Sequence, residues 1–248
     1  TDDSLTWSQY YSIPLAFITG TNGKSTTTRL ASQILRGSGI IVGFSSTDGI
    51  WAGDECLDHG DYSGPGGARE VLRNPRVNAA ILEVARGGLL RRGLGAEKAD
   101  AALITNVAED HLGEYGVNTL AELIEAKFIV RKSLGPDGKL VLNADDIGIV
   151  SFVQKLGASL ANKIVWFSLD KNNLKFADHF LKQGSAYFVD ADKIVAQTGT
   201  QARTICTVTD VPITLNGYAR HNIYNALAAA ALTHTMGASI EQIRAGLC

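Results

Sequence analysis

The stretch ITGTNGKSTTTRL, residues 18–30, decides the fold. An apolar run at residues 14–19 predicts a buried strand, a glycine loop follows it, and residues 25–36 carry apolar side chains at helical spacing. In this order of strand, loop and helix, backbone N–H groups at the helix N-terminus point at phosphate oxygens. The sequence therefore predicts a phosphate-binding loop made of Gly20, Thr21, Asn22, Gly23, Lys24, Ser25 and Thr26.

The loop is a short form of this motif. The first glycine of the longer pattern GxxxxGK(S/T) would fall at Ile18, so only the GTNGKS portion matches. In such loops the lysine, here Lys24, reaches the β and γ phosphates, and the hydroxyl of the next residue, here Ser25, ligates Mg²⁺. The alternative is a glycine turn that only ends a strand and begins a helix. The loop alone does not separate kinases, ATPases and ligases, but the missing NKxD signature argues against a GTPase.

Apolar runs alternate with helical patterns along the first 160 residues. Further strands are predicted by the apolar runs at 40–44, 78–84, 99–106 and 139–143, and a helix by the spacing over 119–132. Continuous apolar strands alternating with helices indicate an α/β fold, with a mostly parallel sheet covered by helices on both faces. Short β-like runs over 163–215, the last of them at 211–215, predict hairpins or a small antiparallel subsheet packed on the main one, and helices return at 221–235 and 239–247.

Composition excludes several classes of protein. Of the 248 residues 45% are hydrophobic and 19% charged, unlike a disordered chain. A balance of 23 basic against 25 acidic residues argues against a general nucleic-acid or anionic-membrane binder, and no apolar run approaches the roughly 18 residues of a membrane span. Three widely spaced cysteines and an N-terminus without signal-peptide features lead us to expect a cytoplasmic protein.

Further motifs follow the loop in a fixed order. They are TNVAEDHLGEYG at 105–116, Lys127 in the next predicted helix, LNADD at 142–146 and HNIYNALAAAA at 221–231. Together with the loop they resemble the ATP-binding central domain of the Mur ligase superfamily. The resemblance implies that residues 1–248 form one such central domain, and that the N-terminal and C-terminal partner domains are absent from this chain.

Three other stretches narrow the resemblance. STDGIWAGDE at 46–55, GDYSGPGGARE at 60–70 and LEVARGGLLRRGLG at 82–95 look like the Mur-ligase-like part of cyanophycin synthetases. This resemblance implies an ATP- and Mg²⁺-dependent, ADP-forming ligase that activates a carboxylate as an acyl phosphate and joins an amino acid such as arginine to an aspartate side chain. Its partners would be ATP, the acidic acceptor, the amino-acid donor, the ATP-grasp and C-terminal domains of a parent chain, and possible further copies of itself. The alternatives are a ligase for cell-wall precursor peptides and a nucleotide-binding module without ligase activity of its own.

The resemblance also assigns roles to single residues. It implies that Glu83 holds Mg²⁺ with Ser25, and that His111 and a carbamylated Lys127 serve a second metal ion, so that Lys24, His111 and Lys127 form the catalytic set. The other interpretations are a turn-capping carboxylate at Glu83, an ordinary loop histidine at His111 and a surface lysine at Lys127. For Glu109 and Asp110 a structural role is equally open.

Two asparagines in the last long helix are candidates for contact with adenine. Asn222 and Asn225 lie three residues apart, on one helix face, and an amide offers both a donor and an acceptor to the base edge. The resemblance places adenine here, whereas Asn222 could instead cap the helix N-terminus. Asn143, in the LNADD motif, could hold a turn or approach the nucleotide.

A last group of residues is expected to face the acceptor. They are Thr47, Asp48 and residues 61–67, and the glycines in the latter stretch permit close approach of the backbone to a substrate. Three arginines in the following string present paired N–H donors to carboxylates. They are Arg86, Arg91 and Arg92, for which the alternative is a solvated basic turn.

Overall fold

A computed structural model describes residues 13–37, 39–109, 113 and 116–248, and one sheet of eleven strands runs through these residues. The strand order is β11-β10-β9-β8-β7-β6-β1-β5-β2-β3-β4. Seven neighbouring strands are parallel: β1 (Leu15–Thr19), β2 (Val42–Ser46), β5 (Ala79–Glu83), β6 (Ala99–Ile104), β7 (Leu134–Asn143), β8 (Ile164–Ser168) and β9 (Ser185–Asp190). The predicted α/β fold with a mostly parallel sheet is confirmed.

Antiparallel strands extend the sheet at both edges. At one edge β3 (Gly49–Ala52) and β4 (Glu55–His59) follow β2, and at the other β10 (Lys193–Thr198) and β11 (Gln201–Thr207) follow β9. Hairpins or a small antiparallel subsheet were predicted over residues 163–215, and β9, β10 and β11 do pair as antiparallel hairpins. Two details differ: β8 is buried on both faces and pairs in parallel with β7 and β9, and the antiparallel strands continue the main sheet instead of packing on it.

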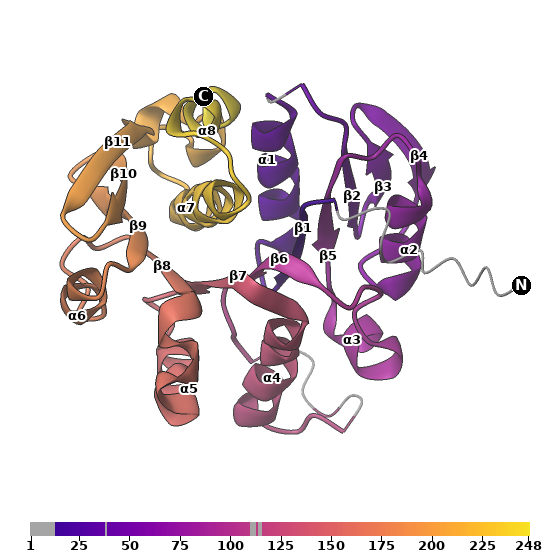
Figure 1. Ribbon diagram of the computed structural model, residues 1–248, viewed down its shortest axis with the longest axis horizontal. Helices are drawn as coiled ribbons and strands as arrows, with labels where there is room; N and C mark the ends of the chain where they lie inside the picture. Colours follow the sequence, from indigo (N-terminus) through magenta and orange to yellow (C-terminus); the bar gives the residue numbers. More distant parts are fainter. Residues whose placement is uncertain (1–12, 38, 110–112, 114–115) are drawn as a thin grey trace, which may run out of the picture.

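Helices cover both faces of the sheet, as Figure 1 shows. One face carries α1 (Lys24–Arg36), α7 (Arg220–Thr235) and α8 (Ile240–Leu247). The other carries α2 (Pro65–Arg73), α3 (Arg86–Arg92), α4 (Leu120–Lys127), α5 (Ile147–Leu156) and α6 (Phe176–Leu181). Strand β1 alternates accordingly, with Ile18 packed toward the first group and Phe17 toward the second, because successive side chains of a strand point to opposite faces.

The helix α7 packs beside α1 on the same face of the sheet, where it contacts strands β6 to β9. Its central residues, from Ala226 to Leu232, are at most 1% exposed, and small alanine side chains let the neighbouring backbones approach closely. A similar contact joins α8 to α1, where a Cβ built on Gly246 would lie 2.5 Å from the Cα of Ile34. The phosphate loop and α1 are therefore held from behind by two further helices.

Several local predictions need correction. The helix expected over 119–132 is α4, begun by a capping box at Thr119, and then continues as a tighter 3-10 helix at Phe128–Ser133. The run expected as a strand near 211–215 is a 3-10 turn at Pro212–Thr214, because proline supplies no N–H to a sheet. The hairpin β3–β4 and the helices α2, α3, α5 and α6 were not predicted.

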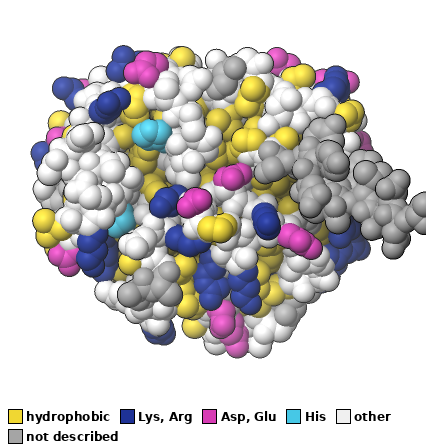
Figure 2. Space-filling view, viewed as in Figure 1, with side chains coloured by type: hydrophobic (Ala, Val, Ile, Leu, Met, Phe, Trp, Pro, Cys, Tyr) yellow, Lys and Arg dark blue, Asp and Glu magenta, His cyan; other side chains and the backbone are white. Residues whose placement is uncertain are grey.

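Side chains on the visible surface are mixed in type. Figure 2 shows lysine and arginine interspersed with acidic and apolar side chains on this face, as a net charge of −2 leads one to expect. Among the described residues, no helix is both long and apolar enough to cross a membrane.

Candidate functional site

The parallel strands end together at one edge of the sheet, where the predicted site residues gather. The phosphate loop joins β1 to α1 at this edge, and Glu83 is the last residue of β5. In open α/β sheets, ligands bind in the crevice outside the carboxyl ends of the strands. Two cavities flank the loop here, one of about 700 Å³ and one of about 800 Å³.

The phosphate loop separates the two cavities residue by residue. Gly20, Thr21 and Lys24 line the smaller cavity, whereas Asn22, Gly23 and Thr26 line the larger one. The two sets of lining residues have no member in common. We call the smaller one the acceptor-side cavity and the larger one the base-side cavity. The names refer to the ligands that the sequence analysis expects beside the residues that line each cavity.

Two glycines give the loop its shape. Gly20 has φ of 147° and Gly23 has φ of 83°, conformations that L side chains rarely adopt. A Cβ on Gly20 would lie 1.9 Å from Thr105 Oγ1, and one on Gly23 would lie 2.2 Å from Asn225 Oδ1. Both glycines are therefore required by close packing as well as by backbone conformation.

Lys24 and Ser25 begin α1 directly after the loop. The Lys24 ammonium folds back and donates to the carbonyl of Thr21 at 2.9 Å, inside the acceptor-side cavity. The Ser25 hydroxyl lies 3.0 Å from the hydroxyl of Thr47, the residue that follows β2. No side chain caps the N-terminus of α1, so its first N–H groups are available to an anion.

Glu83 is the most unusual group at this edge. It is 1% exposed, and neither carboxylate oxygen has a hydrogen-bond partner among the residues that the structure describes. Burial raises the pKa of Glu83 above its usual value, and the nearby Ser25 hydroxyl and Lys24 ammonium oppose that shift. A buried carboxylate without a donor is costly unless a cation pairs with it, so the surroundings of Glu83 fit a bound metal ion.

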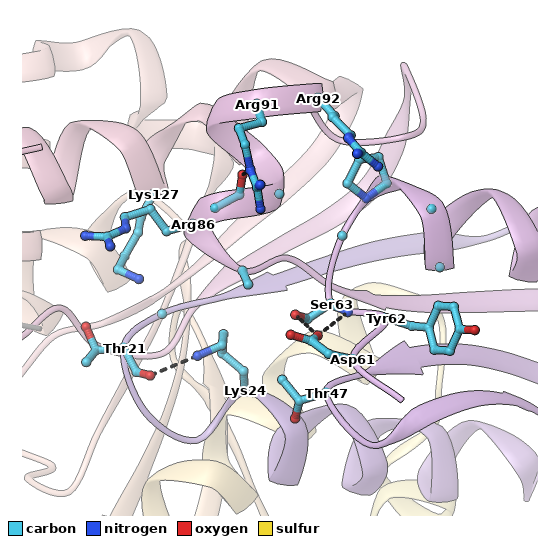
Figure 3. A pocket seen from close by; sticks show the side chains of 18 of the residues that line it. Thr21, Lys24, Thr47, Asp61, Tyr62, Ser63, Arg86, Arg91, Arg92 and Lys127 are labelled. Carbon is cyan, nitrogen blue, oxygen red and sulfur yellow. Dashed lines mark hydrogen bonds between the residues drawn. The ribbon is translucent and has the colours of Figure 1, made fainter. Parts of the chain in front are cut away.

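The acceptor-side cavity is lined by basic side chains. Arg86, Arg91 and Arg92 reach it from α3, and Lys127 reaches it from the last turn of α4 (Figure 3). Lys24 lies on the opposite wall, beside Thr47. The arrangement creates a positive field suited to anionic groups beyond those that the phosphate loop itself would hold.

The residues 61–67, which were expected to face the acceptor, form a third wall of the same cavity. Asp61 is the acidic member, and its Oδ1 accepts hydrogen bonds from the Ser63 N–H at 3.0 Å and the Ser63 hydroxyl at 2.6 Å. The wall is fixed to α3, since Ala85 N–H donates to Ser63 O at 2.8 Å and a Cβ on Gly88 would lie 3.1 Å from Gly64 Cα. The arginines and this loop thus form one packed unit.

Lys127 is 4% exposed. Its position in the cavity wall contradicts the alternative of a surface lysine on an amphipathic helix. By contrast, Asp48 was expected to face the acceptor but does not line the cavity. Its carboxylate forms a solvent-exposed salt bridge with Arg29 at 2.7 Å. Glu109 is exposed. His111 and Asp110 lie outside the described residues.

The base-side cavity has aromatic and amide walls. Phe167 and Tyr224 line it together with His221, Asn222 and Asn225. The Tyr224 hydroxyl donates to Asp145 Oδ2 at 3.0 Å, and burial, with the adjacent Asp145 carboxylate, raises the pKa of Tyr224 to about 12. Because Phe167 is 0% exposed, Tyr224 supplies the accessible aromatic surface, which together with nearby amides has the composition expected of a site for a planar base.

The two predicted asparagines are less available to a base than expected. Asn225 is 6% exposed, and its side chain already accepts from Thr27 Oγ1 at 3.3 Å and donates to Asn222 Oδ1 at 3.1 Å. Asn222 donates to Ile213 O at 2.7 Å. Since α7 begins at Arg220, Asn222 is not its N-cap.

Asn143 supports the turn interpretation. It is buried, donates to Thr105 O at 3.1 Å and accepts from Asp145 N–H at 2.9 Å. The amide therefore fixes the exit of β7 against β6 with one of its two N–H donors, although the residue also lines the base-side cavity.

Other residues of this site were missed at the level of sequence. Thr105 and Asn106, which follow β6, bond to the phosphate loop, and Tyr224 and Phe167 form the wall of the base-side cavity. The TN pair at the start of the TNVAEDH motif was a signal for the first two. Among the described residues, no three His, Cys, Asp or Glu side chains come together as a preformed metal site.

Comparison with known proteins agrees with the fold and with these motifs. A family model described as the Mur ligase middle domain matches residues 18–233. The cyanophycin synthetase of Geminocystis herdmanii is 40% identical over 95% of this chain, and the chain spans only 26% of that protein's length.

Two solved structures share the fold at low sequence identity. A UDP-N-acetylmuramoyl-L-alanyl-D-glutamate–2,6-diaminopimelate ligase aligns with a TM-score of 0.71 and 18% identity, over 96% of this chain and 46% of the other. A bifunctional folylpolyglutamate synthase/dihydrofolate synthase with Mn, AMPPNP and L-glutamate bound aligns with a TM-score of 0.62 and 22% identity, over 94% of this chain and 57% of the other.

Proposed function

Because the chain belongs to the Mur ligase family through its middle domain, we propose that it is the nucleotide-binding and phosphoryl-transfer part of an ATP-dependent amide ligase. The observation that carries the proposal is the position of Glu83, a buried carboxylate without a partner in the described residues, next to Lys24 and Ser25. A strand end, a phosphate loop and an unpaired acid in one crevice fit a nucleotide bound with a metal ion.

The residues present fit Mg²⁺ as the metal. Glu83 would supply a carboxylate oxygen and Ser25 a hydroxyl, which are the hard oxygen ligands that Mg²⁺ prefers. When bound, the ion would neutralise charge that develops on the phosphate oxygens. The bound Mn and AMPPNP of the folylpolyglutamate synthase support a divalent metal and a nucleoside triphosphate for this fold.

The proposed reaction has two steps. The γ-phosphoryl group passes from ATP to an acceptor carboxylate, which gives an acyl phosphate and ADP, and an amine then attacks the acyl carbon and expels phosphate. Lys24 would hold the transferred phosphoryl group from the loop side. Arg86, on the far wall of the acceptor-side cavity, would orient the carboxylate for attack.

The basic wall also supports an acidic acceptor. Arg86, Arg91 and Arg92 on α3 are positioned to bind carboxylates through paired N–H donors. With the 40% identity to a cyanophycin synthetase, this favours the addition of an amino acid such as arginine to an aspartate side chain. A cell-wall precursor is the second candidate, favoured by the fold shared with the diaminopimelate ligase, and a nucleotide-binding module inactive without the rest of the parent chain is the third.

Lys127 is proposed to act as a carbamate. It is buried in a wall shared with three arginines, where an ammonium group adds to the repulsion and a carbamate would reverse it. The negative oxygens of a carbamate would pair with these guanidinium groups or serve a second metal ion. We propose that His111 is the other ligand of that second metal ion.

Calorimetry with ATP tests nucleotide binding directly. We expect the chain to bind ATP with an affinity that rises when Mg²⁺ is added, and to bind GTP more weakly. An ATP-dependent assay of phosphate release, with a panel of acidic acceptors and amino-acid donors, then tests ligation by the full-length parent. Binding of ATP without any acceptor-dependent phosphate release from the parent would support the module without ligase activity, and no binding would refute the proposal.

A further inference from the structure

Asn106 contacts the main chain of the phosphate loop with both ends of its amide. Its Oδ1 accepts from the Asn22 N–H at 3.0 Å, and its Nδ2 donates to the Asn22 carbonyl at 3.0 Å. The side chain thus pairs with one loop residue as a neighbouring strand would. Asn106 lies two residues after the end of β6, the strand adjacent to β1.

Neighbouring atoms reinforce this contact. The main-chain carbonyl of Asn106 accepts from the Thr21 N–H at 2.9 Å, and the Thr105 hydroxyl donates to the Asn22 carbonyl at 2.7 Å. The Thr21 hydroxyl in turn bonds to Ala108, accepting from its N–H at 3.1 Å and donating to its carbonyl at 3.2 Å. We call Thr105, Asn106 and Ala108 the loop clamp.

Such support is important because the loop contains two glycines. Gly20 and Gly23 give it two positions with unusual backbone freedom, and an unsupported loop of this kind would lose entropy on ordering around phosphate. Asn225 holds the opposite flank, against Gly23 and Thr27. The loop is therefore fixed from β6 on one side and from α7 on the other.

We propose that Asn106 is a positioning residue that keeps the phosphate loop in its binding shape, an inference that rests on the proposed function. Asn106 would affect phosphate binding through the main chain of Asn22, because it hydrogen-bonds to both the N–H and the carbonyl of that residue. Asn106 also lines the base-side cavity, but both ends of its amide are engaged by Asn22, whereas Tyr224, His221 and Asn222 line that cavity from α7. Loss of the amide should therefore weaken binding of the triphosphate selectively.

The test compares ATP with adenosine on the chain and on Asn106→Leu, which keeps side-chain size and charge while removing both hydrogen bonds. We expect the affinity for Mg·ATP, measured by calorimetry, to fall at least tenfold, or about 1.4 kcal/mol. Adenosine affinity, measured by saturation-transfer NMR, should stay within twofold. Asn172→Leu, at an exposed asparagine outside both cavities, is the matched control and should change neither value.

Each outcome decides the proposal. If Asn106→Leu binds Mg·ATP within threefold of the unsubstituted chain, or loses ATP and adenosine affinity by the same factor, the positioning role is wrong. If the leucine variant gives no cooperative melting transition, Asn106→Ala is judged by the same criteria. Failure of the unsubstituted chain to bind ATP would instead overturn the proposed function, and the role of Asn106 with it.

Discussion

Replacing Glu83 by glutamine should stabilise the protein in the absence of ligand. Glu83 is 1% exposed, and its two oxygens have no hydrogen-bond partner among the described residues. Burial raises the pKa of Glu83, although the Ser25 hydroxyl and the Lys24 ammonium pull it the other way. In the folded protein without metal, the neutral form of the Glu83 side chain is therefore more favourable, relative to the charged form, than it is in water.

The size of the effect follows from the group that is relieved. A buried polar group without a partner costs about 1–3 kcal/mol, and more if it is charged. Glutamine keeps the shape and a neutral amide, so we expect Glu83→Gln to raise the free energy of unfolding by about 1–2 kcal/mol near neutral pH. For a chain of this size each kcal/mol is worth about 2–4 °C in Tm.

The pH dependence of this gain has a definite sign. Between the usual pKa of glutamate and the raised pKa in the fold, the folded state binds more protons than the unfolded state. The free energy of unfolding of the unsubstituted chain therefore falls as the pH rises through that window. The Glu83→Gln variant has no such pH-dependent loss of stability. The difference in free energy of unfolding between the variant and the unsubstituted chain should therefore be largest above this pH range and vanish below about pH 4, where both side chains are neutral.

Thermal melts at about pH 4 and pH 8, with and without Mg·ATP, measure both parts of the prediction. At the higher pH and without ligand, the Tm of Glu83→Gln should be higher than that of the unsubstituted chain. Adding Mg²⁺ should raise the Tm of the ATP-bound variant little, because the variant lacks the carboxylate proposed to hold the metal. The same gain at both pH values, or a variant less stable than the unsubstituted chain at pH 8, would refute the reasoning from buried charge.

Two further substitutions separate phosphate binding from catalysis. Lys24→Ala should lower ATP affinity at least tenfold in calorimetry while changing the free energy of unfolding by only about ±0.5 kcal/mol, since the side chain is half-buried and donates its hydrogen bond to Thr21 of the loop; loss of its melting transition would make Lys24 structural. Lys127→Ala in the full-length parent should reduce turnover far more than ATP affinity, and added formate or acetate should restore part of it by replacing the carbamate oxygens; turnover at the unsubstituted rate would rule out the proposed role.

The centre of the fold could be predicted because its signals are local. The glycine loop has a strand before it and a helix after it, and the strands next to β1 are continuous apolar runs. The edge hairpin β3–β4 was missed because β4 is largely exposed and lacks a hydrophobic pattern. Pairing also escaped prediction: the run that became β8 reads the same whether its neighbours are parallel or antiparallel, since only tertiary contacts decide this.

The candidate site could be predicted as a set of residues but not as a set of contacts. Lys24 and Ser25 were found because they follow a strand and a glycine loop, and Glu83 because it ends a strand, and the structure brings them together. Asp48 was expected in the acceptor-side cavity, but its partner Arg29 is 19 residues away and draws it to the surface. Asn225 was expected to meet a base, yet it contacts the residues of α1 behind the loop, which no spacing in the sequence could reveal.

The division of the crevice by the phosphate loop has a consequence for how such enzymes diversify. Residues 61–67 and α3 form the acceptor-side cavity, while β8 and α7 form the base-side cavity, and the two share no lining residue. Under the proposed function, substitutions on α3 would thus change which carboxylate is accepted without altering recognition of the nucleotide. A lineage with this fold would then acquire new substrates by exchanging one surface segment and keep ATP as its energy source.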